Sequence, residues 1–133
     1  MLARSQWWRL ALIAGCVILA YDTLASSASR LTGIPYGRFA VASYLLQIAA
    51  AFVARRSGSS AMQAVLLASW VGIVEATIGW GISWLIGPGH PTAFVGPATV
   101  VAIAIIVAVT ASVCGGFGAA LASIGRPSSP REA

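Results

Sequence analysis

The sequence predicts an all-α fold: a polytopic membrane protein that forms a four-transmembrane-helix bundle with both termini inside the cell (N-in/C-in). Hydrophobic residues make up 59% of its 133 residues and charged residues only 8%, whereas a soluble domain averages about 25% charged residues. The apolar residues also fall into four runs, each near the roughly 20 residues that cross a bilayer. This composition excludes a disordered chain, a coiled coil and an ordinary water-soluble enzyme.

Arginine, glycine and proline residues separate the four apolar runs. We expect the spans at about residues 8–28, 36–54, 61–86 and 94–123. Residues 1–125 would then form a single transmembrane domain, followed by a polar, disordered C-terminal tail at residues 126–133.

The first span can also be interpreted as a secretory signal. Arginines precede its apolar run and small residues follow at 25–28, which is the pattern of a signal peptide with its cleavage site. Cleavage would leave only three spans, and the distribution of the arginines would then have no explanation. We therefore favour an uncleaved first helix.

The arginine distribution predicts the orientation. With the N-terminus inside, six arginines lie on the cytoplasmic side and two on the outer side, namely Arg4, Arg9, Arg55, Arg56, Arg126 and Arg131 against Arg30 and Arg38. Because cytoplasmic loops carry an excess of Lys and Arg, both termini are predicted in the cytoplasm. The chain has neither Lys nor Asn, which indicates a GC-rich, bacterial genome and therefore the bacterial inner membrane.

Glu75 is the strongest candidate for a functional residue. It lies about midway along the span 61–86, where an acid costs about 2.5 to 3.5 kcal/mol and normally faces a bundle interior or a water-filled cavity. A helix-packing face of small residues runs beside it: Ala68, Gly72, Ala76, Gly79 and Ser83. Two roles stay open for Glu75, a protonatable group in a carrier or a neutral carboxyl that hydrogen-bonds between helices.

Asp22 lies in the outer half of the first span, with Arg30 two turns later on the same helix face and Arg38 at the start of the second span. Together with Glu75, these residues would line an outward-facing proton or substrate pathway. The alternative is an ion pair between Asp22 and one of the two arginines that only fixes the helix ends. We favour this second role for Asp22.

Two other groups of residues have simpler expected roles. Trp80 and Trp84 fit the aromatic belt at a membrane surface, whereas Trp70 lies deeper and is expected near Glu75. Cys16 and Cys114 lie in apolar segments and are expected to pack as small residues.

Few signs of catalysis or metal binding occur. His90 lies in a Gly/Pro turn without further ligands at metal spacing, so no metal and no cofactor are predicted. The sequence lacks a nucleophile motif, HExxH, a phosphate-binding loop and CxxC, so we predict no enzyme. The charges are too scattered for nucleic-acid binding.

These observations favour a small-solute or ion transporter, or a channel-like conduit, with Glu75 as its protonatable centre. Because four short helices enclose little volume, we expect the chain to form a homo-oligomer or to bind another membrane protein within the lipid bilayer. The alternative is a non-catalytic accessory subunit that docks its partner on the small-residue face of the third span.

Overall fold

The computed structural model describes residues 4–88 and 96–124, and over these residues the chain is helical without any strand. The predicted all-α class is therefore confirmed. The elements, in chain order, are α1 (Arg4–Thr32), the short 3-10 helix η1 (Tyr36–Phe39), α2 (Ala40–Arg56), α3 (Ala61–Val74), the π-helix η2 (Glu75–Gly79), α4 (Trp80–Ile86) and α5 (Pro97–Ser123).

In the described part of the chain, four helical stretches are long and apolar enough to cross a membrane. They are Gln6–Thr32, Tyr36–Arg56, Ala61–Ile86 and Pro97–Ser123. The number of spans and the bounds of the third agree with the sequence prediction, whereas the first span is longer at both ends. His90, the predicted tail at 126–133 and the first residues of the predicted fourth span lie outside the described residues.

Local sequence signals explain where the helices begin and end. Gly33, with φ +73°, follows the last residue of α1, because glycine enters this left-handed region without steric cost. The turn between α2 and α3 ends in a reciprocal cap: the Gln63 N–H donates to Ser60 Oγ, and the Ser60 N–H donates to Gln63 Oε1. This capping box fixes the start of α3.

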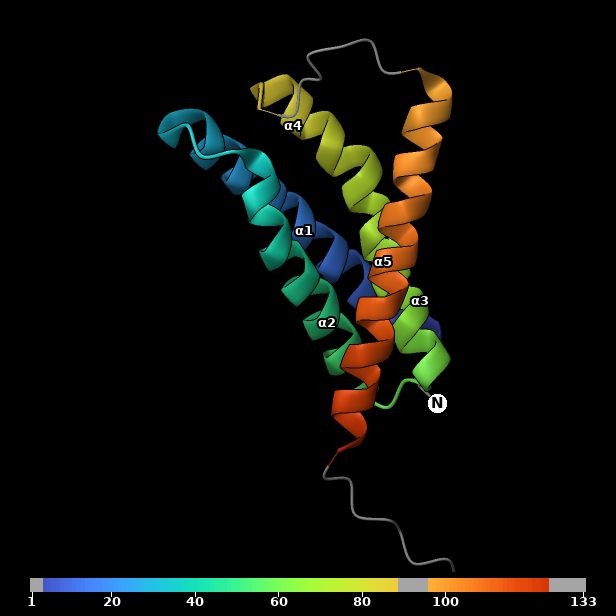
Figure 1. The fold of residues 1–133 in the computed structure, drawn as a ribbon. Helices are drawn as coiled ribbons and strands as arrows, with labels where there is room; N and C mark the ends of the chain where they lie inside the picture. The colour runs from blue at the N-terminus through green and yellow to red at the C-terminus, as the bar shows by residue number, and fades with distance from the viewer. Residues whose placement is uncertain (1–3, 89–95, 125–133) are drawn as a thin grey trace, which may run out of the picture.

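The four spans alternate in direction, so that α1 and the continuous α3–η2–α4 stretch run parallel (Figure 1). Two side chains of α1 fix this pairing. Near one end Trp7 Nε1 donates to the Gln63 carbonyl at 3.1 Å, and near the other Arg30 Nη1 donates to the Ile86 carbonyl at 2.8 Å. In each pair the two residues are 56 positions apart, so both ends of α1 lie beside the corresponding ends of the third span.

Helices α2, α3 and α5 pack closely at one end of the bundle, through small residues. Gly115 of α5 lies so near α3 that a Cβ built on it would be 2.7 Å from the Ala68 Cβ. Gly118 of α5 likewise faces the backbone carbonyl of Ile48 in α2. Small residues allow helices to approach closely and gain van der Waals contact. At the opposite end α4 contacts α1 but not α5, and the helices spread apart (Figure 1).

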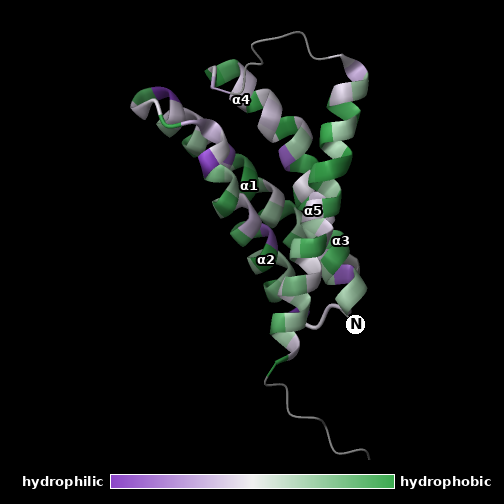
Figure 2. Cartoon of the chain, viewed as in Figure 1, coloured by the Kyte–Doolittle hydropathy of each residue, from purple (hydrophilic) through white to green (hydrophobic). Residues whose placement is uncertain are grey.

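The bundle exposes many large apolar side chains, and Figure 2 shows that apolar residues occur along all of its helices. Large aliphatic side chains are exposed on all four spans, for example Leu24 (69%), Leu45 (61%), Leu66 (51%) and Val113 (68%). Water-soluble monomers rarely expose contiguous apolar patches larger than a few hundred Å². This surface fits surroundings other than water.

The contact between α5 and α2 gives a direct test of the packing. Replacing Gly118 by Ala places a Cβ against the Ile48 carbonyl oxygen, so we expect a loss of about 1 to 3 kcal/mol in the free energy of unfolding. Gly116 has no atom within 4 Å of its Cβ position, so Gly116→Ala is the matched control and should not destabilise. Unfolding in mixed detergent micelles measures both; equal losses for the two variants would contradict this packing.

Candidate functional site

Glu75 begins the π-helical segment η2, which interrupts the third span between α3 and α4. A π-helix bonds each carbonyl to the N–H five residues on, so it shifts the helix face by one residue relative to an α-helix. The small-residue face therefore contacts two different neighbours. Gly72, before the segment, lies against Ala111 of α5, whereas Gly79, at its end, lies against Asp22 of α1.

All five residues of the predicted packing face are buried: Ala68, Gly72, Ala76, Gly79 and Ser83. Ala68 packs on α5 through Gly115. Ser83 belongs to α4, which contacts α1 and η2. The face is thus covered by other helices of the same chain over its length.

The Glu75 carboxyl is directed toward α2. Its Oε2 accepts a hydrogen bond of 2.8 Å from Nε2 of Gln47, a side chain only 1% exposed. Ser43, one turn earlier on the same face of α2, is also buried and lines a cavity together with Glu75. The acid therefore has polar neighbours inside the bundle.

Asp22 is buried in α1 at 1% exposure. Its Oδ1 accepts a hydrogen bond of 3.1 Å from the Tyr36 hydroxyl, and its Oδ2 lies against Gly79 with no hydrogen-bond partner in the described part of the chain. The ion pair expected with Arg30 or Arg38 is not formed. Arg30 instead reaches the Ile86 carbonyl, and Arg38 is exposed.

The arginine contact has a clear physical cause. Ile86 is the last residue of α4, and the last carbonyls of a helix lack partners within the helix. A long basic side chain satisfies such a carbonyl and interacts favourably with the helix dipole. Arg30 therefore fastens α1 to the end of α4 rather than neutralising Asp22.

Three cavities meet at the side chain of Tyr36. The first, which we call the carboxylate cavity, has a volume of about 160 Å³ and is lined by Tyr36, Glu75, Ala76, Trp80, Ile103 and Val107. The second, the serine cavity, has about 60 Å³, and its lining includes Tyr21, Tyr36, Ser43 and Glu75. The third, the outer cavity, has about 690 Å³, and its lining includes Arg30, Tyr36 and Trp84. Tyr36 thus stands between the outer cavity and the two cavities at Glu75.

The electrostatic character of the site is acidic. It contains two acids, Asp22 and Glu75, and none of the described residues that line the carboxylate and serine cavities is basic. Within residues 4–88 and 96–124, no group of three or more His, Cys, Asp or Glu side chains comes together to hold a metal. The arrangement suits the binding of a proton or a single positive charge.

Three buried oxygen atoms lie along the contact between α1 and the η2–α4 stretch, namely Asp22 Oδ2, Ser26 Oγ and Ser83 Oγ. None of them has a hydrogen-bond partner in the described residues. Ser26 lies one turn beyond Asp22, and Ser83 one turn beyond Gly79. A buried polar group without a partner costs about 1 to 3 kcal/mol. The small-residue contact between α3 and α5 contains no such atom in the described residues.

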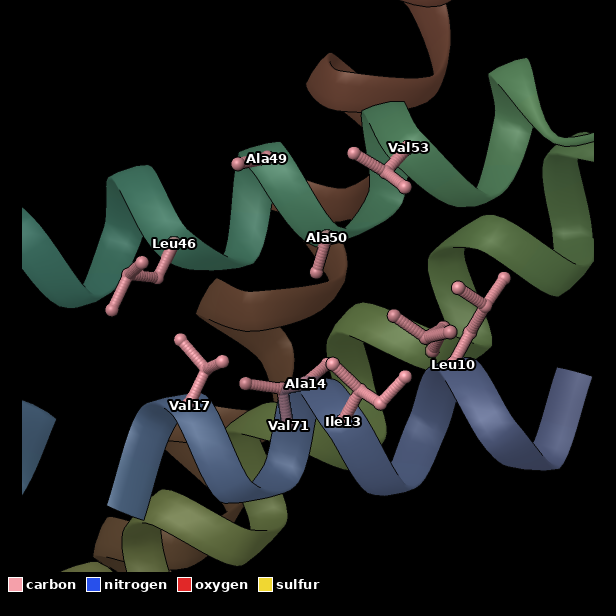
Figure 3. Close-up of a pocket in the computed structure, with 10 residues that line it drawn as sticks. Leu10, Ile13, Ala14, Val17, Leu46, Ala49, Ala50, Val53 and Val71 are labelled. Atoms are coloured by element: carbon pink, nitrogen blue, oxygen red, sulfur yellow. The ribbon is translucent and has the colours of Figure 1, made fainter. Parts of the chain in front are cut away.

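A further hollow lies between α1 and α2 and is purely aliphatic (Figure 3). It has a volume of about 200 Å³, and Val17 of α1 and Leu46 of α2 face each other across it. The hollow offers no polar atom to orient a ligand, so it is not part of the candidate site.

No protein-family model, curated protein or solved structure matches this chain.

The candidate site thus differs in part from the pathway that the sequence predicts. Asp22 accepts a hydrogen bond from Tyr36, which lines two cavities together with Glu75, and Arg30 lines the outer cavity, whereas Arg38 lines none of the three cavities. Trp70 packs edge-on against Trp8, with ring centroids 6.3 Å apart, and it lines neither cavity at Glu75. Trp80 lines the carboxylate cavity.

The sequence shows Tyr36, Ser43, Tyr44 and Gln47 as polar groups of the second span, but the predicted pathway did not include them. A signal for three of them exists, because spacings of seven and four residues place Tyr36, Ser43 and Gln47 on one face of the second span. Tyr44, the remaining polar residue of that span between Arg38 and Arg55, falls on another face and is exposed. Only the helix rotation seen in the structure directs the buried face at Glu75.

Gly79 and Asp22 provide a test of the site geometry. A Cβ at Gly79 would collide with the Asp22 carboxyl, whereas a Cβ at Gly81 meets no atom within 4 Å. We expect Gly79→Ala to lower the free energy of unfolding by about 1 to 3 kcal/mol and Gly81→Ala to leave it nearly unchanged. In the double variant that also carries Asp22→Ala, the added methyl group should lower the free energy of unfolding much less. An undiminished cost in that background would contradict the contact.

Proposed function

We propose that the chain is an integral protein of the bacterial inner membrane with both termini in the cytoplasm. Its four apolar helices and exposed aliphatic side chains support insertion. The excess of arginines on the side of the termini and of the α2–α3 turn supports the orientation.

Cysteine labelling tests this orientation. In a background with Cys16 and Cys114 replaced by Ala, Thr32→Cys at the end of α1 should react with a membrane-impermeant maleimide in intact cells. Ser57→Cys, in the turn after α2, should react only after the membrane is permeabilised. Both side chains are exposed, so a difference in labelling does not come from burial of one of them in the bundle. The reverse pattern would overturn the orientation, and labelling of both positions in intact cells would overturn a single topology.

We further propose that the protein moves a small solute or ion across the bilayer, with Glu75 as the group that gains and loses a proton. The observation that carries this proposal is the place of its carboxyl, which lies midway along a span and lines two cavities. An acid in the middle of a span is costly and is commonly found on a transport pathway.

Gln47 is suited to both protonation states of this carboxyl. Its Nε2 donates to Glu75, and its Oε1 is buried without a partner in the described residues. An amide holds a donor and an acceptor, so rotation of the side chain would let Oε1 accept from a protonated carboxyl. Proton uptake at Glu75 therefore does not require that its contact with Gln47 be lost.

The packing also supports an alternation of access. Tyr36 separates the outer cavity from Glu75, and glycine-mediated contacts of α5 with α2 and α3 close the other half of the bundle. Movement of the Tyr36 ring would join Glu75 to the outer cavity. Separation of α5 from its neighbours would open the other side.

The alternative of an accessory subunit lacks the surface it needs. The small-residue face expected to dock a partner is covered by α5 and α1, so a partner would first have to displace one of them. A homo-oligomer or another membrane partner stays a prediction from the sequence.

Proteoliposomes test transport. Vesicles with an internal pH dye are loaded with a small cation, a small anion or a neutral solute, and the pH change is followed after dilution. At least one solute gradient should drive a pH change that Glu75→Gln reduces about tenfold or more, equivalent to about 1.4 kcal/mol. Thr77→Val, an exposed polar position two residues away, is the control and should behave as the parent protein.

Equal rates in the parent protein and Glu75→Gln, with both variants folded by circular dichroism, would refute the role of Glu75. A pH change in none of the three vesicle sets would refute proton-coupled transport of a small solute.

A further inference from the structure

We propose that the carboxylate cavity binds a small organic cation, an amine or ammonium ion no larger than about a benzene ring. The inference rests on the proposed function, since it takes this cavity as the place where the transported solute sits. It adds the chemical class of that solute.

The charges around the cavity select a cation. Glu75 lines it directly, the Asp22 carboxyl accepts a hydrogen bond from Tyr36, which also lines it, and none of the described residues that line it is basic. The hydrogen bond from Gln47 is neutral and does not cancel a negative charge. In apolar surroundings an uncompensated carboxylate is unfavourable, and a bound positive charge offsets that cost. An anion would meet the Glu75 carboxyl and no counter-charge among the described residues that line the cavity.

The remaining walls select an organic rather than an inorganic cation. Trp80 and Tyr36 present aromatic rings, and Ile103 and Val107 of α5 present aliphatic groups. Aromatic faces attract ammonium groups, with Trp the most effective, when the cation lies within about 6 Å of the ring. An inorganic divalent cation such as Ca²⁺ instead requires six or more oxygen ligands. The described residues hold no cluster of three acids, histidines or cysteines that could bind it.

The volume limits the size of the ligand. A cavity of about 150 Å³ in another protein accepts benzene, and the carboxylate cavity measures about 160 Å³. A trimethylammonium group with a short substituent fits this space, whereas tetraphenylphosphonium does not.

The position of the cavity agrees with such a ligand. It lies between Trp80 of α4 and two residues of α5, helices that do not contact each other. Arg30, the one basic residue among the described residues that line the outer cavity, donates a hydrogen bond to the Ile86 carbonyl. It does not line the carboxylate cavity.

Binding of choline and of 3,3-dimethyl-1-butanol to the purified protein in lipid nanodiscs tests the inference. The two molecules have nearly the same shape, and only choline carries a charge. We expect choline to bind and its neutral counterpart to bind at least tenfold more weakly, with tetraphenylphosphonium failing to compete. Because this comparison uses the unmodified protein, it stands even if a variant fails to fold.

Two variants then locate the site. Glu75→Gln should weaken choline binding about tenfold or more, and Trp80→Leu about 3- to 30-fold, the range expected for one cation–aromatic contact. Trp70→Leu is the control, since Trp70 packs on Trp8 and lines none of the cavities at Glu75. Its affinity for choline should equal that of the parent protein.

The outcomes separate this inference from the proposed function. Absence of choline binding, equal binding of the neutral molecule, or equal affinity in Glu75→Gln would overturn the cation site, even where another solute drives Glu75-dependent transport in vesicles. Choline binding that depends on Glu75 and Trp80, without transport in any vesicle set, would support the cation site and overturn the proposed function.

Discussion

A carboxyl group in the middle of an apolar helix must receive polar neighbours from the rest of the chain, and much of this structure follows from that requirement. Gln47 of α2 donates a hydrogen bond to Glu75, so α2 must present its polar face inward. Tyr36 and Ser43 lie on the same face, which brings the start of α2 against α1 and lets Tyr36 reach Asp22. One acid thus determines the rotation of its neighbour and, through it, the surroundings of a second acid.

The bundle divides into halves with different kinds of contact. In one half, α5 approaches α2 and α3 through Gly118 and Gly115, and close van der Waals contact stabilises it. In the other half, α1 meets η2 and α4 through Asp22, Ser26 and Ser83, and one oxygen of each, Oδ2 in Asp22 and Oγ in the serines, lacks a partner in the described residues. Opening the first half loses good packing, whereas opening the second exposes polar atoms that water would satisfy. Conformational change is therefore expected to begin in the second half.

Hydropathy and arginine positions were enough to predict the four spans, because a bilayer imposes length and composition on every helix that crosses it. The surroundings of Glu75 were harder to predict from the sequence. The spacing of Tyr36, Ser43 and Gln47 indicates a shared face, but only tertiary packing decides toward which helix that face turns. The π-helix at Glu75 is a local change in hydrogen bonding with no residue signature. The expected pairing of Asp22 with Arg30 failed because a long side chain can reach a helix-end carbonyl instead.

The π-helix joins these observations. By shifting the face of the third span, it lets Gly72 pack on α5 and Gly79 pack on Asp22, so one helix serves two different neighbours. A regular α-helix would continue the small-residue face toward one side only. The shift also lets Trp80 line the carboxylate cavity together with Glu75, at the point where α4 and α5 no longer meet. Return of this segment to α-helix would turn α4 relative to α3 and so alter the cavity, its aromatic wall and the contact with Asp22 together.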